Sequence, residues 1–174
     1  MAEHFNELWP FALRLYAREG VSAACRRLQD EGGLDVCELL WLCWLDNRGL
    51  VLAERDEDWQ AALTGVRRWQ RDVTEPLRRQ RRQLKPLAER LPRLATLRGH
   101  IKQAELEAER EALTRLEALA RQGEGIRPRP AHAGPAFGLD AMLHRWAGSL
   151  PAGLDAELFH VAQMARADAE PTGA

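Results

Sequence analysis

Acidic and histidine side chains at helical spacing are the first candidates for chemistry in this chain. Glu157 and His160 form one Glu-x-x-His sequence, the spacing that places two metal ligands on one face of a helix. A di-iron site of that kind needs a second such pair and two further carboxylates. Asp140 and His144 are four residues apart, so the chain holds no second pair. We therefore predict no metal site and no cofactor, and we interpret His160 as a surface residue of an amphipathic helix.

Hydroxyl and thiol side chains are the next candidates, because either could act as a nucleophile. Ser22 and Ser149 are the only serines, and neither lies in a Gly-x-Ser-x-Gly sequence. Cys25, Cys37 and Cys43 lie in apolar segments without a neighbouring histidine, and their spacing fits neither a zinc site nor a redox pair. No glycine-rich phosphate-binding motif occurs either. We predict no catalytic residue, and we expect the thiols to be buried and free in a reducing compartment.

Polar residues around the turn at Gly32-Gly33, the glycine corner, form a candidate pocket next to the most apolar segment of the chain. Gln29, Asp30 and Asp35 flank the corner, and Trp41 and Trp44 follow within the apolar segment. One interpretation is a small polar pocket that binds a ligand. The other, which the residue types favour, is structural: Asp35 caps the next helix, and Gln29 satisfies backbone groups at the corner.

A basic belt is the strongest surface signal, since residues 67–102 hold twelve basic and three acidic residues. Arginine binds phosphates and carboxylates through two parallel hydrogen bonds. The residues that we predict to bind a partner share helix faces in this belt: Arg67, Arg71, Arg78, Arg82 and Lys85.

Three interpretations of the basic belt stay open. The favoured one is neutralisation by acids on a facing helix, namely Glu105, Glu107, Glu109 and Glu111. An acidic protein partner comes second. Nucleic acid comes third, because Trp69 is the only aromatic residue in the belt and its spacing places it in the core.

These groups must be positioned by helices, and one helix is central. From Val36 to Leu45 only Glu38 is charged, so the predicted helix is apolar on every side and must be covered on every side. The segment is too short to cross a membrane, which takes about 20 residues. We expect Asp35 to cap this helix, and two shorter helices at residues 7–19 and 22–31 to precede it.

The rest of the chain reads as a helical hairpin and a shorter pair of helices. A helical pattern over residues 56–85 is interrupted at Pro76, where the helix either restarts or continues with a kink, and breaks are predicted at Pro86 and Pro92. A second long helix, over residues 94–121, should pack back on the first. No segment alternates well enough to predict a strand.

The predicted fold is therefore all-α, with six to seven helices. A compact N-terminal three-helix unit packs on a long, Pro-kinked antiparallel helical hairpin, and a loosely tethered C-terminal helix pair follows. The predicted division is 1–121 for the helical core domain, 122–137 for a mobile Gly/Pro-rich linker, 138–168 for the helix pair and 169–174 for a frayed tail.

The N-terminal half resembles an uncharacterised bacterial family, DUF2390, also called TIGR02444, which occurs mainly in gammaproteobacteria. The resemblance covers about residues 8–120. An Asn usually follows Asp-Val in that family, where this chain has Cys37. The matching residues include Leu8-Trp9-Pro10-Phe11-Ala12-Leu13, Ala24-Cys25, Leu28-Gln29-Asp30, Asp35-Val36, Trp44-Leu45, Pro76-Leu77-Arg78 and Ala104-Glu105-Leu106-Glu107. The resemblance implies a small cytoplasmic helical protein and assigns no activity.

Three functional hypotheses follow. The first is a non-catalytic cytoplasmic interaction or adaptor protein that docks an acidic or apolar protein partner through the basic belt or the tryptophan-rich N-terminal unit. The second is a nucleic-acid- or ribonucleoprotein-associated factor that uses the Arg-rich helix. The third is a small-ligand or enzymatic pocket beside the central helix. We expect no membrane association, and an exposed tryptophan patch would mark a docking site or a homo-oligomer interface.

Overall fold

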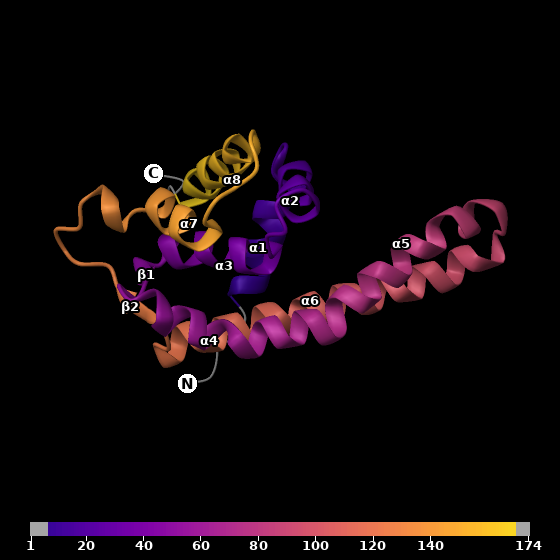
Figure 1. Cartoon of the computed structure of the whole chain (residues 1–174), viewed down its shortest axis with the longest axis horizontal. Helices are drawn as coiled ribbons and strands as arrows, with labels where there is room; N and C mark the ends of the chain where they lie inside the picture. Colours follow the sequence, from indigo (N-terminus) through magenta and orange to yellow (C-terminus); the bar gives the residue numbers. More distant parts are fainter. Residues whose placement is uncertain (1–6, 170–174) are drawn as a thin grey trace, which may run out of the picture.

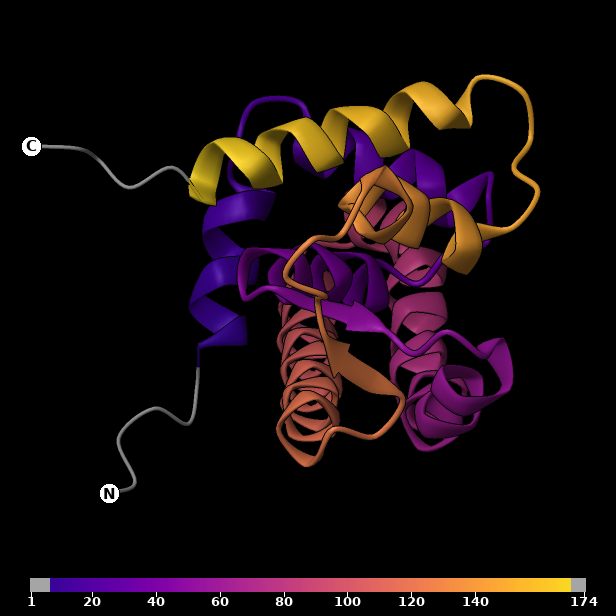
Figure 2. The same ribbon diagram turned by 90° about the vertical axis from the view of Figure 1, so that its left-hand side faces the viewer.

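The central helix α3 (Val36–Asn47) organises the fold, as the sequence predicts. The computed structural model describes residues 7–169. Every residue from Cys37 to Leu45 is buried, including the charged Glu38. Helices α1 (Leu8–Tyr16) and α2 (Val21–Asp30) contact α3, and so do α6 (Arg93–Gln122), α7 (Leu139–Ala147) and α8 (Leu154–Ala169). Elements from both ends of the chain thus cover the apolar helix (Figure 2).

A long helical hairpin leaves this core and extends well beyond it (Figure 1). Its first rod runs without interruption through α4 (Asp56–Trp69), the π-helix η1 (Gln70–Thr74) and α5 (Glu75–Arg90). Its second rod is α6 (Arg93–Gln122), which returns antiparallel to α5. Counted in this way, the described residues form seven helical rods, because α4, η1 and α5 are one rod and η2 (Pro135–Phe137) is a single 3-10 turn. The all-α prediction with six to seven helices is confirmed.

The prolines of the hairpin act differently from one another. At Pro76 the rod continues, because Pro76 follows the wider π turn and lies in the first turn of α5. The predicted break at Pro86 is wrong: Pro86 lies inside α5, in an exposed stretch where water can bond the carbonyl that loses its donor. The break at Pro92 is confirmed, since Leu91 is extended and Pro92 caps α6.

Two short strands correct the prediction that the chain has none. Strand β1 (Leu50–Leu52) pairs antiparallel with β2 (Ile126–Pro128), with Val51 opposite Arg127. Part of the predicted mobile linker is therefore a paired strand. Gly125 permits the approach, because its φ is +68° and a Cβ there would lie 2.6 Å from the Cα of Trp59. A three-residue strand that pairs across so much sequence carries no local alternation to detect.

The C-terminal helices α7 (Leu139–Ala147) and α8 (Leu154–Ala169) are packed rather than loosely tethered. Their apolar residues, such as Leu143 and Val161, belong to the same core cluster as α1, α2 and α3. This packing could not be predicted from the sequence, because the partners of α7 and α8, α3 and α2, are distant along the chain. The residue boundaries of the four-part division stay a prediction. Residues 170–174 of the predicted tail lie outside the described residues.

Candidate functional site

Asp35 joins the start of α3 to the π turn of the long rod. Its side chain accepts hydrogen bonds from the backbone amides of Cys37 at 2.8 Å and Glu38 at 3.1 Å, so the predicted N-cap is confirmed. The Nε2 group of Gln70 also donates to both carboxylate oxygens, at 3.2 and 2.9 Å. One carboxylate therefore fixes the entry of the central helix and the base of the hairpin at the same time.

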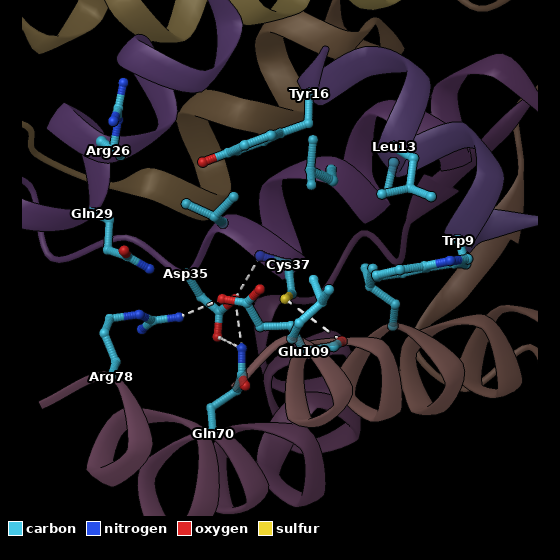
Figure 3. Close-up of a pocket in the computed structure, with 15 residues that line it drawn as sticks. Trp9, Leu13, Tyr16, Arg26, Gln29, Asp35, Cys37, Gln70, Arg78 and Glu109 are labelled. Carbon is cyan, nitrogen blue, oxygen red and sulfur yellow. Dashed lines mark hydrogen bonds and ion pairs between the residues drawn. The ribbon is translucent and has the colours of Figure 1, made fainter. Parts of the chain in front are cut away.

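A cavity of about 160 Å³ lies beside this carboxylate (Figure 3). One wall is apolar and contains Trp9, Leu13 and Tyr16 from α1 and Leu106 from α6. The other end is polar and contains Gln29, Asp35, Gln70, Arg78 and Glu109. Residues from α1, α2, α3, η1, α5 and α6 thus meet around one space that is apolar on one side and polar on the other.

Charge at the polar end is only partly compensated. Arg78 donates from Nε to Glu105 at 3.0 Å and from Nη2 to Glu109 at 2.8 Å, so two carboxylates share its guanidinium. Burial raises the pKa of Glu109, although Arg78 opposes the shift. Burial, with a contribution from Glu38, also raises the pKa of Asp35, although Gln70 and the capped amides oppose it. Both carboxyls are therefore held where a negative charge is costly.

The π turn supplies polar atoms without partners at the same place. Gln70 is only 6% exposed, and its Oε1 atom is buried with no hydrogen-bond partner in the described part of the chain. The Oγ1 atom of Thr74, one helical turn later, is in the same state. A buried acceptor without a donor destabilises the fold by about 1–3 kcal/mol. Single π turns inside α-helices often occur at functional sites, and this one borders the cavity.

The structure brings together only part of the pocket that the sequence suggested. Gln29 and Asp35 line the cavity, while Asp30 lines an adjoining wider recess and binds Arg82 at 2.6 Å. Trp41 is fully buried in the core and does not line the cavity. Trp44 is also absent from the lining, and the guanidinium of Arg48 lies 5.0 Å from the centre of its ring.

Four charged or amide residues of the cavity were not assigned to a pocket from the sequence: Arg26, Gln70, Arg78 and Glu109. A polar residue in the apolar stripe of a helix is a usable signal, and Gln70 follows Trp69 in such a stripe. Arg78 was assigned to the basic belt alone. Glu109 carries no signal, because only the return of α6 along α5 brings it to the cavity.

Most of the proximal part of the basic belt is neutralised within the fold, although Arg68 and Arg79 form no ion pair with the described residues. Arg67 forms two 2.8 Å hydrogen bonds to the buried Glu38, and Arg71 binds Asp72. Arg81 binds Glu105, as Arg78 does. Of the four acids expected to neutralise the belt, Glu105 and Glu109 bind belt arginines, whereas Glu107 bonds Gln103 and Glu111 binds Arg115.

The far end of the hairpin, residues 83–102, differs from the proximal belt, and we call it the distal arm. It has five basic residues, Lys85, Arg90, Arg93, Arg98 and Lys102, and one acid, Glu89, which gives a net charge of +4. Within residues 7–169, none of these five bases forms an ion pair. The helix α5 has no buried residue, and the first buried residue of α6 is Glu105. Leu87, Leu91 and Leu97 are exposed on this arm.

Residues proposed or excluded for other chemistry have structural partners. His160 Nε2 lies 2.9 Å from the carbonyl oxygen of Glu19, and Glu157 binds Arg27. In the part of the chain that the structure describes, no group of three His, Cys, Asp or Glu side chains could hold a metal ion. Cys25, Cys37 and Cys43 are free and buried, and burial raises the pKa of Cys25 to about 12. No helix among the described residues is long and apolar enough to cross a membrane.

Comparison with known proteins gives one match. A family model described as a protein of unknown function, DUF2390, matches residues 7–116. This range includes the cavity residues and the whole distal arm. No curated protein and no solved structure matches the chain.

Proposed function

Since the chain belongs to the DUF2390 family, whose function is unknown, we propose a role from its own surfaces: it is a non-catalytic cytoplasmic interaction protein whose distal arm docks an acidic amphipathic helix of a protein partner. The observation that carries this proposal is the contrast along the hairpin. Five of the seven arginines in residues 67–82 bind carboxylates of the same chain, whereas none of the five bases of the distal arm does so among the described residues.

The apolar residues of the distal arm support a protein partner. Leu87 lies on α5, and Leu91 directly follows the last residue of that helix, with its backbone N–H donating to the Leu87 carbonyl at 2.8 Å. Both are exposed, as is Leu97 on α6. These leucines leave apolar surface on two packed helices, against which an amphipathic helix can bury its apolar face. Basic residues beside these leucines would then pair with acids on the partner.

Charge and composition favour this occupant over two others. A second copy of the chain would place one +4 arm against another, and like charges in contact are repulsive. Nucleic acid would use the bases but not the leucines, and the distal arm contains no Phe, Trp or Tyr for stacking on bases. An acidic amphipathic helix uses both the positive charge and the apolar groups.

Site-specific photo-crosslinking tests this proposal in cell lysate. A photoreactive phenylalanine analogue replaces Leu97 on the distal arm, and the matched control carries it at Phe159, an exposed position on α8. Samples are divided between nuclease treatment and none, at low and high salt. Mass spectrometry then maps the crosslinked segment. A charge-reversed variant, Arg90→Glu with Arg93→Glu, carries the same crosslinker at position 97.

The expected result is an adduct at position 97 whose partner segment is acidic and amphipathic. It should survive nuclease, weaken at high salt and disappear in the charge-reversed variant. Three results would overturn the proposal: an adduct that nuclease removes, an adduct with a second copy of this chain or with lipid, or no adduct above that of the Phe159 control.

A further inference from the structure

Side chains that line the cavity beside Asp35 have hydrogen-bond acceptors that the described residues do not use. The Oδ2 atom of Asp35 takes one hydrogen bond, from Gln70 Nε2 at 2.9 Å, although a carboxylate oxygen can accept two. Glu109 uses Oε1 for Arg78, and its Oε2 atom accepts no hydrogen bond from residues 7–169. The buried Oε1 atom of Gln70 is also without a donor. These three side chains come from α3, α6 and η1 and line the same cavity.

Carboxylate acceptors of this kind favour a hydrogen-bond donor that carries positive charge. Arg78 lines the cavity, and its guanidinium is divided between Glu109 and Glu105. Arg26, on α2, also lines the cavity, but it is exposed and its Nε group donates to the carbonyl of Ser22. A cation with several N–H groups would pair with Asp35 and Glu109.

The opposite wall defines the rest of the ligand. Trp9 and Tyr16 come from α1, and Figure 3 shows both rings beside the cavity. Leu13 and Leu106 are largely exposed although they line the same space. Exposed apolar side chains beside a polar floor are typical of a site for a small ligand. An apolar cavity of about 150 Å³ can hold benzene, which sets the scale for this one.

We propose that this cavity binds a small organic cation with an amidinium, guanidinium or ammonium head and an apolar or aromatic body. The head contacts Asp35 and Glu109, and the body lies against Trp9, Tyr16 and Leu106. This site is separate from the distal arm and does not depend on the partner proposed above.

Three probes of similar shape and different charge test the assignment: benzamidine, benzamide and benzoate. Each is titrated into the full chain, and binding is followed by isothermal titration calorimetry and by chemical-shift changes of the Gln70 side-chain amide. Two variants remove one charge each with little change of shape, Asp35→Asn and Glu109→Gln. Asn is as good an N-cap as Asp, so the first variant keeps α3 capped. Glu111→Gln is the control, because Glu111 binds Arg115 on the exposed surface.

We expect saturable binding of benzamidine, at least about tenfold weaker binding of benzamide, and weaker binding still of benzoate. Asp35→Asn and Glu109→Gln should each weaken benzamidine about tenfold or more, while Glu111→Gln leaves it unchanged. The proposal is overturned if benzoate binds as well as benzamidine, which would assign the site to Arg26 and Arg78. It is overturned equally if both charge-removing variants bind benzamidine normally, or if no probe binds at millimolar concentration.

Discussion

Arginines at the two ends of the helical hairpin differ in whether they bind carboxylates. At the end near the body, Arg78 and Arg81 bind Glu105, a carboxylate that is buried between the two rods. At the far end, among the described residues, Arg90 and Arg98 donate only to backbone carbonyls, of Pro86 and Arg81. One uniform basic belt in the sequence is therefore two surfaces. Arginines of the first hold the two rods of the hairpin together, and the second is the surface that we propose for a partner.

The same contrast holds for leucine. Leu42 in α3 is fully buried, whereas Leu97 in the distal arm is 46% exposed. Apolar contacts thus stabilise the core, while the distal arm is held by helices α5 and α6 that continue from the core. This difference gives expectations for substitutions at four positions, from the largest expected loss of stability to the smallest.

Leu42→Ala should produce the largest effect. Removing a fully buried leucine leaves a cavity in the most covered helix, and such changes lower the free energy of unfolding by about 2–5 kcal/mol. Urea denaturation followed by circular dichroism measures the loss. A loss below about 1 kcal/mol would mean that α3 is not the centre of the core.

Glu38→Gln should rank second. Glu38 accepts two hydrogen bonds from Arg67 at 2.8 Å and one from Trp146 Nε1 at 2.6 Å, so it links the hairpin to α7. Because Arg67 is partly exposed and can return to water, we expect a loss of about 2 kcal/mol rather than the full cost of breaking a buried pair. Thermal unfolding of this variant beside Glu107→Gln, an exposed acid in the same hairpin, makes the comparison. Equal melting temperatures would contradict the link.

Asp35 separates a capping effect from a charge effect. Asp35→Ala removes the cap and should lower stability by about 1 kcal/mol, while Asp35→Asn keeps an acceptor for the Cys37 and Glu38 amides. The amide of Gln70 can rotate in that variant, so that its oxygen accepts from the new Asn. Denaturation of both variants at neutral pH measures the difference. Equal losses would show that the charge of Asp35, and not its cap, stabilises α3.

The difference in stability between the wild type and Asp35→Asn should depend on pH with a defined sign. Burial raises the pKa of Asp35 above its ordinary value of 3.8, so the folded chain binds this proton more tightly than the unfolded chain. The contribution of the protonated Asp35 carboxyl to stability is therefore fully present below pH 3.8, the ordinary pKa, and is lost as the pH rises through the raised pKa. Relative to Asp35→Asn, the wild type should lose stability as the pH rises through this window. The charge of Asp35 also contributes to the raised pKa of Glu109, so the difference between the two chains reports Asp35 together with this coupling.

Leu97→Ala should have the smallest effect. A substitution at an exposed site without special contacts changes stability by no more than about 0.5 kcal/mol. Under the proposed function, the same change should weaken partner binding. Leu97→Ala should therefore affect binding without affecting stability, whereas Leu42→Ala should lower stability. A large loss of stability would show that the distal arm is part of the core.

Local patterns predicted the fold well where neighbours in sequence are also neighbours in space. The cap at Asp35, the covered helix from Val36 and the stop at Pro92 depend on adjacent residues, and the structure has all three. The β1–β2 pairing and the docking of α7 and α8 depend on partners far along the chain, where a single sequence gives no register.

The candidate site shows the same limit. Gln29 and Asp35 could be identified because they flank one corner, but Glu109 reaches the cavity only through the return of α6. Trp41 was grouped with the pocket because it is close in sequence, although its helical position turns it into the core. Helix packing decides which of several polar residues share a cavity, and that information is not local.

The pairing of Leu50 with Pro128 has a consequence for how the length of the hairpin can change. The strand pair closes a loop that contains α4, α5 and α6, so the whole hairpin is an insertion between two neighbouring strands. The entropy of closing a loop grows only with the logarithm of its length, by about 0.6 kcal/mol for each doubling. Adding or removing a few helical turns at the far end would alter that term by a few tenths of a kcal/mol or less. The loop-closure entropy therefore places almost no thermodynamic constraint on the length of the hairpin, which can vary without destabilising the core.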